Sequence, residues 1–391
     1  MLDKKTPLLR SMDAISKQAC RILKLFGKNV ERVTTTVGPE QEYFLVDKKY
    51  YDQRKDLIFT GRTLFGAMSP KGQEMDDHYF GTIKPRVAAF MADLDTELWK
   101  YGILAKTKHN EVAPAQHEIA PIFTTTNTAT DNNQLVMDVA KKVALQHGMV
   151  CLLHEKPFDG VNGSGKHNNW SMSTNQGENL LNPGSDPKEN AQFMLILTAV
   201  ISAVDKYAKL MRISVASAGN DHRLGANEAP PAIVSVFLGD ELQSIVDDII
   251  AGTHTAGAGA AKIQLGVTTL PVFSKDNTDR NRTSPFAFTG NRFEFRMPGS
   301  SQNIACVNMM LNTAVADVFK NYADELEGAE DFDAALNALV KRELTAHQRV
   351  IFNGNGYDDS WVEEAEKRGL PNLKSTPEAL ACYDEFVDVF E

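Results

Sequence analysis

The chain has 391 residues, of which 42% are hydrophobic and 24% are charged, and its formal net charge is −10. This ordinary globular balance excludes wholesale disorder, and the acidic excess argues against a nucleic-acid binder. The sequence contains neither an apolar run near the ~18 residues of a membrane span nor a signal-peptide core at its charged N-terminus. The four cysteines lie far apart, as expected of thiols in a reducing cytoplasm rather than of a zinc cage or a disulfide framework.

Apolar spacing and turn residues predict an irregular succession of helices and strands. In chain order we expect a helix at 6–26, two strands at 32–46 around a turn at Gly38-Pro39, a long loop at 54–82, a helix at 87–102, strands at 103–123 interrupted by Pro114, a helix at 131–148, strands at 149–158 and 167–174, a helix at 188–211, a mobile connection at 251–261, and a strand at 291–297 followed by helices. Hairpin-like strands with irregularly inserted helices predict the α+β class with a mostly antiparallel sheet.

The last predicted helix starts with good capping chemistry at Ser375-Thr376-Pro377-Glu378. Its apolar stripe runs to the last residue, Glu391, without a stop signal. This pattern is typical of a chain that is cut short, or of a C-terminal helix that docks on the body.

Two carboxylates are expected on one face of the first strand region. In GPEQEYFLV, alternation places Glu40 and Glu42 on the same side, where they repel each other unless a cation lies between them. A solvated sheet face is the alternative explanation.

A second acidic pair follows in NEVAPAQHEI. Glu111 and Glu118 are seven residues apart, which places them on opposite faces of an uninterrupted strand. Pro114 favours a bulge or bend between them, and a bulge would bring both carboxylates to one side.

The third acidic position is Glu294 in NRFEFR, where alternation directs the two phenylalanines to a core. Arg292, Glu294 and Arg296 then share the opposite face. A solvent-facing ladder of ion pairs would have the same pattern.

A glycine-rich turn at 158–167, FDGVNGSGKH, nearly matches a phosphate-binding P-loop. His167 stands where the magnesium-binding hydroxyl should be, and the next residues alternate like a strand instead of forming a helix. We therefore reject the P-loop interpretation. Gly163 and Gly165 fit a close backbone approach to a ligand, and His167 is either a metal ligand or a structural histidine.

Together the segments GPEQEYF, NEVAPAQHEIAP, NGSGKHNNWS, NDHRLGANEAP and NRFEFR resemble the glutamine synthetase family in order and spacing, over residues 30–310. The residues of these motifs are most similar to those of the type III branch of bacteria and protists. The resemblance implies a glutamine synthetase/guanido kinase-like catalytic domain, with a curved sheet and helices packed outside.

The resemblance also assigns roles to individual residues. The implied ligands of two or three Mg²⁺ or Mn²⁺ ions are Glu42, Glu111 and Glu118 for one ion and Glu40, His167 and Glu294 for a second. The implied glutamate-binding positions are Asn162, Gly163, Arg223 and Arg296. The implied nucleotide-side positions are Asn169, Ser171 and Arg292. The implied catalytic residues are Glu228, a flap carboxylate that takes a proton from ammonium, and Arg282.

The implied reaction joins ammonia to the side-chain carboxylate of glutamate, with ATP, through a γ-glutamyl phosphate. The alternatives are a related γ-glutamyl amine ligase with another acceptor and a non-catalytic scaffold of the same fold. The expected organisation is an N-terminal helix at 1–28, a catalytic domain at 29–325 and a truncated helical extension at 326–391. The resemblance also implies an N-terminal β-grasp domain, which we expect to be absent from this chain because no room remains for it before residue 38, and it implies homo-oligomers, often ring-stacked dodecamers.

Overall fold

The computed structural model describes residues 2–227, 229–253, 262–263, 273–274 and 283–390. Within these residues nine strands form one sheet in the order β2-β3-β1-β6-β11-β10-β7, with β4 and β5 also paired to β1. β7 and β10 pair in parallel, whereas the other named pairs of this sheet are antiparallel. The predicted α+β class with a mostly antiparallel sheet is confirmed. The strands are β1 (Val33–Asp47), β2 (Ala105–Asn110), β3 (Gln116–Pro121), β4 (Thr124–Thr125), β5 (Met149–Leu152), β6 (Lys166–Thr174), β7 (Val236–Phe237), β10 (Phe286–Phe288) and β11 (Phe293–Phe295), and a separate pair is β8 (Lys262–Ile263) with β9 (Phe273–Ser274).

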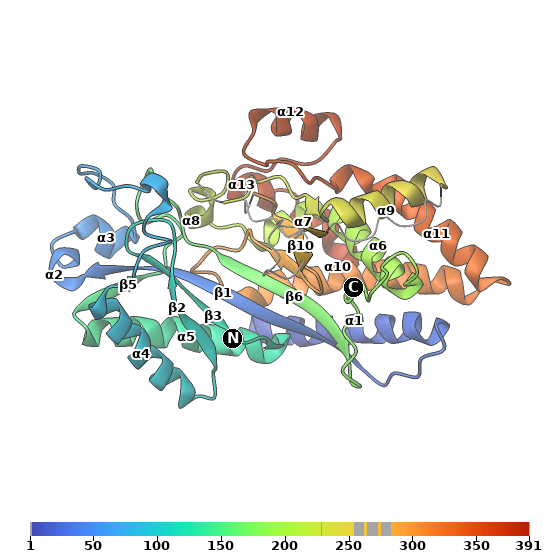
Figure 1. The fold of residues 1–391 in the computed structure, drawn as a ribbon, viewed down its shortest axis with the longest axis horizontal. Coiled ribbons are helices and arrows are strands. Elements are labelled where there is room, and N and C mark those ends of the chain that lie inside the picture. Colours follow the sequence, from blue (N-terminus) through green and yellow to red (C-terminus); the bar gives the residue numbers. More distant parts are fainter. Residues whose placement is uncertain (1, 228, 254–261, 264–272, 275–282, 391) are drawn as a thin grey trace.

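Helices surround this sheet, as Figure 1 shows, with β1 and β6 crossing the middle of the molecule and α1, α4 and α5 beneath them. The α-helices are α1 (Leu2–Leu25), α2 (Lys48–Tyr51), α3 (Lys55–Thr60), α4 (Pro85–Trp99), α5 (Thr126–Gln146), α6 (Ala191–Lys206), α7 (Ala208–Ser214), α8 (Ala218–Asp221), α9 (Asp240–Ala251), α10 (Ile304–Glu327), α11 (Phe332–His347), α12 (Asp359–Lys367) and α13 (Thr376–Leu380). Short 3₁₀ turns are η1 (Glu74–Asp76), η2 (Gln348–Val350) and η3 (Tyr383–Phe390). Among the described residues, no helix is both long and apolar enough to cross a bilayer.

Side-chain alternation divides the sheet between apolar cores and a polar face. Tyr43 and Leu45 of β1 are buried in a core with α4 and α5. Phe293 and Phe295 of β11 are fully buried in the larger core that includes α6 and α10, as their alternation predicts. Because neighbouring strand residues point to opposite sides, Glu294 is directed away from that core.

The first strand corrects one prediction. Residues 33–47 form a single strand instead of two strands around a turn at Gly38-Pro39. β6 pairs with β1 continuously from Val33 to Gln41, while β4 and β3 pair with its other side only at residues 36–37 and 41–44. Pro39 lies in the gap between those two ladders, and an edge-like position of this kind tolerates proline inside a strand.

Other element predictions were wrong in their boundaries. The helix expected at 188–211 is broken at Tyr207 into α6 and α7, and the loop expected at 54–82 contains α3 and η1. The strands expected at 149–158 and 291–297 are limited to β5 and β11. Most of the expected connection at 251–261 lies outside the described residues.

The C-terminal segment begins as predicted, with a complete capping box between Ser375 and Glu378 at the start of α13. It then continues as η3, which contacts α7: Lys209 forms an ion pair with Glu385 at 2.8 Å, and the rings of Tyr207 and Phe386 lie 6.1 Å apart. These contacts hold the segment against the body.

Candidate metal centre and nucleotide cavity

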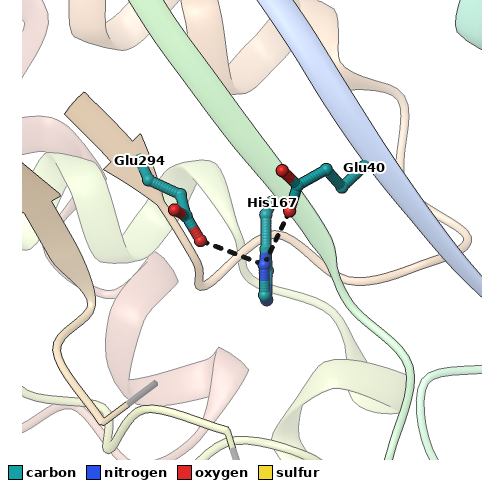
Figure 2. A group of neighbouring side chains, drawn as sticks. All are labelled: Glu40, His167 and Glu294. Atoms are coloured by element: carbon teal, nitrogen blue, oxygen red, sulfur yellow. Dashed lines mark hydrogen bonds and ion pairs between the residues drawn. The ribbon is translucent and has the colours of Figure 1, made fainter. Parts of the chain in front are cut away.

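Three adjacent strands bring Glu40, His167 and Glu294 together (Figure 2). β1 and β6 pair so that Glu40 lies opposite His167, while β11 places Glu294 opposite Asn169, two residues after His167 on β6. Nδ1 of His167 is 3.1 Å from Oε2 of Glu40 and 3.1 Å from Oε1 of Glu294. Since Nδ1 carries at most one proton, it cannot donate fully to both carboxylates. A cation between the three groups would satisfy all of them.

His167 also belongs to a second candidate metal-binding group, together with Glu42 and Glu118. Nε2 of His167 is 3.8 Å from Oε1 of Glu42, and Glu42 lies opposite Glu118 in the β1–β3 ladder. The backbone N–H of Gly165 donates to Oε2 of Glu42 at 2.6 Å and fixes this carboxylate. The glycine-rich turn therefore positions a candidate metal ligand.

A third group joins His109, Glu111 and Glu118. Pro114 lies in the turn between β2 and β3, so the predicted bend is present, and the register shift in this hairpin lies between Lys106 and His109. Across the three groups the structure gathers seven residues, which are the six predicted ligands and His109. His109 is not among the residues predicted from the sequence, although its place two residues before Glu111, in a region predicted to form strands, was a usable signal.

The electrostatics of the cluster reflect its negative charge. Burial raises the pKa of Glu118 well above its ordinary value, and the nearby Glu40, Glu111 and Glu42 raise it further. Burial alone would also raise the pKa of Glu294, but His167 and Arg296 hold it well below the ordinary value. The negative charge of the cluster therefore acts most strongly on Glu118.

This donor set fits the divalent cations that the family resemblance implies. Five carboxylates and imidazole nitrogens converge within a polar, largely buried volume. Carboxylate oxygen suits Mg²⁺ or Mn²⁺, and an imidazole ligand is also accepted by Mn²⁺. The residues that would hold the ions are Glu40, Glu42, Glu111, Glu118, His167 and Glu294.

Proton release should accompany metal binding. Burial lowers the pKa of His167, but hydrogen bonds to Glu294 and Glu40 outweigh this effect and raise the pKa from 6.5 to about 10. The protonated ring therefore stabilises the metal-free fold, fully below pH ~6.5 and progressively less as the pH rises through about 10. A cation must displace that proton, so we expect the apparent Mn²⁺ affinity to rise over this window with release of at least about one proton.

Calorimetric titration at pH 8 in two buffers of different ionisation enthalpy measures this release. His167→Gln should reduce both the release and the pH slope. An Mn²⁺ affinity that is independent of pH between 6.5 and 9 would contradict the expectation.

A cavity of about 460 Å³ adjoins the cluster along β1, β6 and the residues just before β11. All three predicted nucleotide-side residues, Asn169, Ser171 and Arg292, line it together with Glu40. Nε of Arg292 donates to Oδ1 of Asn169 at 2.9 Å, and Nδ2 of Asn169 donates to Oε1 of Glu40 at 3.0 Å. This chain of contacts links the cavity to the candidate metal centre, and the volume is that of a small-molecule site.

The predicted glutamate positions Asn162 and Gly163 lie in the glycine-rich turn, which contacts the cluster through the bond from Gly165 to Glu42. Nε2 of Gln73 donates to Oδ1 of Asn162 at 2.8 Å, so the 54–82 segment contacts this turn. The carbonyl of Gly163 accepts from Nε2 of Gln116 at 2.8 Å. The turn is thereby tied to both the loop and β3.

The two predicted glutamate-binding arginines differ in their surroundings. Nε of Arg296 donates to Oε1 of Glu294 at 2.9 Å, which places it at the cluster. Arg223 is buried, and its guanidinium donates to backbone carbonyls of residues 296–298. Glu228 and Arg282 lie outside the described residues, so their predicted roles stay predictions.

Comparison with known proteins identifies the family behind this geometry. The model of the glutamine synthetase catalytic domain matches residues 17–234, and that of the glutamine synthetase C-terminal domain matches residues 335–390. The glutamine synthetase of Butyrivibrio fibrisolvens is 56% identical over an alignment of 391 positions, which covers 98% of this chain and 55% of that protein. The type-3 glutamine synthetase of Dictyostelium discoideum is 53% identical, over 97% of this chain and 52% of its own length. The chain thus spans about half the length of these relatives.

Solved structures agree at the level of the fold. A Plasmodium falciparum glutamine synthetase determined by cryo-electron microscopy aligns with a TM-score of 0.54 at 15% identity, over 98% of this chain and 77% of its own. A ligand-free structure of GmaS aligns with a TM-score of 0.52 at 14% identity, over 98% and 74%. The family-model match covers more than half of the chain, and this chain belongs to the glutamine synthetase family.

Proposed function

We propose that this chain carries the active site of a glutamate–ammonia ligase. It would join ammonia to the side-chain carboxylate of L-glutamate through a γ-glutamyl phosphate, giving L-glutamine, ADP and phosphate. The observation that carries the proposal is the contact chain from the Arg292 cavity through Asn169 to Glu40 of the metal cluster. A nucleotide in that cavity would extend its terminal phosphate toward the cluster.

Each site residue has a separate role in the proposed reaction. Divalent cations bound by the cluster would neutralise charge on the transferring phosphoryl group. Arg292 and Asn169 would hold the nucleotide, while Arg296 would fix a carboxylate of glutamate beside Glu294. The glycine-rich turn at Asn162 and Gly163 would present backbone groups to the amino acid. Glu228 would accept a proton from ammonium before the attack, and Arg282 would stabilise the transferred phosphoryl group.

The test is substrate-dependent ADP formation with product analysis. With Mg²⁺ or Mn²⁺, ADP release should require both glutamate and ammonium, and the product should be glutamine. Product formed from polyamines instead of ammonium would assign another γ-glutamyl ligase. Tight Mn²⁺ binding without any ADP release would indicate a non-catalytic scaffold, and both outcomes contradict the proposal.

Arg292→Gln should weaken nucleotide binding selectively. The substitution removes a charged donor from the cavity and its contact with Asn169. Loss of a hydrogen bond to a charged group costs about 1.5–3 kcal/mol, so KM for ATP should rise about tenfold to a hundredfold. KM for glutamate should change much less.

Steady-state kinetics with each substrate varied in turn measures this split. The matched control is Arg342→Gln, which removes an exposed guanidinium paired with Glu325, neither of which lines the cavity. Equal changes in both KM values would place Arg292 outside the nucleotide site.

The assembly and location of the protein are also proposals. The family resemblance implies a homo-oligomer of stacked rings in the cytoplasm, with glutamate, ammonia and ATP as its small-molecule partners. Light scattering of the purified chain measures the mass directly. A monomer at micromolar concentration would contradict self-association of this chain.

A further inference from the structure

The geometry points to His109 as a nitrogen ligand of the cation position that Glu111 and Glu118 form. The metal centre of this chain then contains two imidazoles, His109 and His167. The inference deepens the proposed function, because both place divalent cations at the same cluster. Its test, however, needs no turnover.

Distances support a ligand role for His109. Nε2 of His109 is 3.2 Å from Oε1 of Glu111, and a Glu118 carboxylate oxygen lies within 4.8 Å of both. An octahedral ion with bonds of ~2.1 Å separates neighbouring ligands by about 3 Å. The pairs that His167 forms with Glu40 and Glu294 are 3.1 Å long. The His109 pair therefore has the ligand spacing of the pairs predicted to hold the other ion.

Strand register explains why His109 reaches this position. His109 of β2 lies directly opposite Glu118 of β3, and Glu111 follows two residues later. The ring of Tyr79 packs edge-on against the His109 ring at 5.2 Å between centroids and limits its rotation. The imidazole is thus aimed by backbone pairing and by one aromatic contact.

The two side chains of this pair differ in their exposure to solvent. The Glu111 side chain is 2% exposed, whereas the His109 side chain is 39% exposed. His109 lies between a buried carboxylate and solvent, where an arriving ion would meet it first. A nitrogen ligand also has a chemical consequence, because imidazole favours Mn²⁺ over Mg²⁺ at an otherwise oxygen-rich site.

The sharpest test counts the nitrogens bound to Mn²⁺. Electron spin echo spectroscopy of the Mn²⁺-loaded chain detects ¹⁴N couplings from imidazole ligands. In His167→Gln, a histidine nitrogen coupling should persist, and the double variant His109→Gln/His167→Gln should lose it. Loss of all nitrogen coupling in His167→Gln alone would overturn the inference. If that variant fails to fold, the wild-type chain with ¹⁵N-labelled histidine gives the same count, and a single coupled histidine overturns the inference.

Affinity provides a second readout. Loss of the ligand should weaken one class of Mn²⁺ sites by about tenfold or more and lower the preference for Mn²⁺ over Mg²⁺. The matched control is His147→Gln, which removes another histidine–carboxylate pair, with Asp93 at 2.8 Å, outside the cluster. Identical Mn²⁺ titrations for His109→Gln and the wild type would show that His109 is only an ion-pair partner of Glu111.

The two proposals fail separately. A persistent nitrogen coupling in a chain without ATP turnover would sustain the His109 inference and refute the ligase. Turnover in a chain whose Mn²⁺ couples to His167 alone would do the reverse.

Discussion

Glu118→Gln is expected to abolish turnover while stabilising the metal-free fold. Glu118 belongs to two of the three candidate metal groups, so its loss affects both. Removal of outer partners of metal ligands typically costs 10–100-fold in affinity or activity, so loss of a direct ligand should lower kcat by at least about a hundredfold. Burial and the neighbouring Glu40, Glu111 and Glu42 disfavour the charged form of Glu118 in the folded state, and glutamine imitates the protonated form.

The sign of the stability change follows from linkage. The folded-state pKa of Glu118 is raised, so its charged form destabilises the fold increasingly as the pH rises through that pKa. Thermal unfolding in EDTA should therefore give a higher Tm for the variant at pH 8 and little difference at pH 4. Asp138→Asn on the exposed face of α5 is the control. A lower Tm at pH 8, or retained turnover, would refute the assigned role of Glu118.

Gly163→Ala should destabilise the fold and disrupt the glycine-rich turn. A Cβ at this position would lie 2.3 Å from the backbone carbonyl oxygen of Glu155 and 3.0 Å from Cγ of Arg223. The carbonyl cannot rotate away, and the buried arginine is held by several carbonyls. Overpacking of this kind costs about 1–3 kcal/mol or more in the free energy of unfolding.

Denaturant unfolding measures this cost, and KM for glutamate should rise because Asn162 shifts with the turn. Gly328→Ala is a matched control, since its Cβ would meet only a carbonyl at 3.9 Å. Equal unfolding free energies for the two variants would show that the turn has room for a side chain.

The sequence predicted which side chains face the core more reliably than it predicted the boundaries of the elements, for a physical reason. Strand alternation correctly directed Phe293 and Phe295 into the core and left Glu294 on the other face. The Gly38-Pro39 turn was predicted wrongly because local turn propensity was outweighed by continuous pairing with β6. Such pairing involves residues about 130 positions away in the chain, which a local pattern does not contain.

In the candidate site, too, local patterns were predictable and long-range geometry was not. The sequence shows that the odd spacing of Glu111 and Glu118 needs a bend to bring both side chains to one face. The bend itself requires Ala115 in the left-handed region at φ 64°, which the sequence does not indicate. His109 needed no such knowledge, because its spacing from Glu111 repeats that of Glu40 and Glu42. It was missed because the sequence analysis took its ligands from the family resemblance.

The length of β1 has a consequence for how the chain tolerates insertions and deletions. One continuous strand pairs with β3, β4, β5 and β6, and it supplies both Glu40 and Glu42. Deleting a single residue between positions 33 and 38 would put the start of the strand out of register with β4 and β6 while the rest stays paired with β3 and β5, because the side-chain period is two. Insertions should therefore be tolerated in the loops between elements and selected against in this strand.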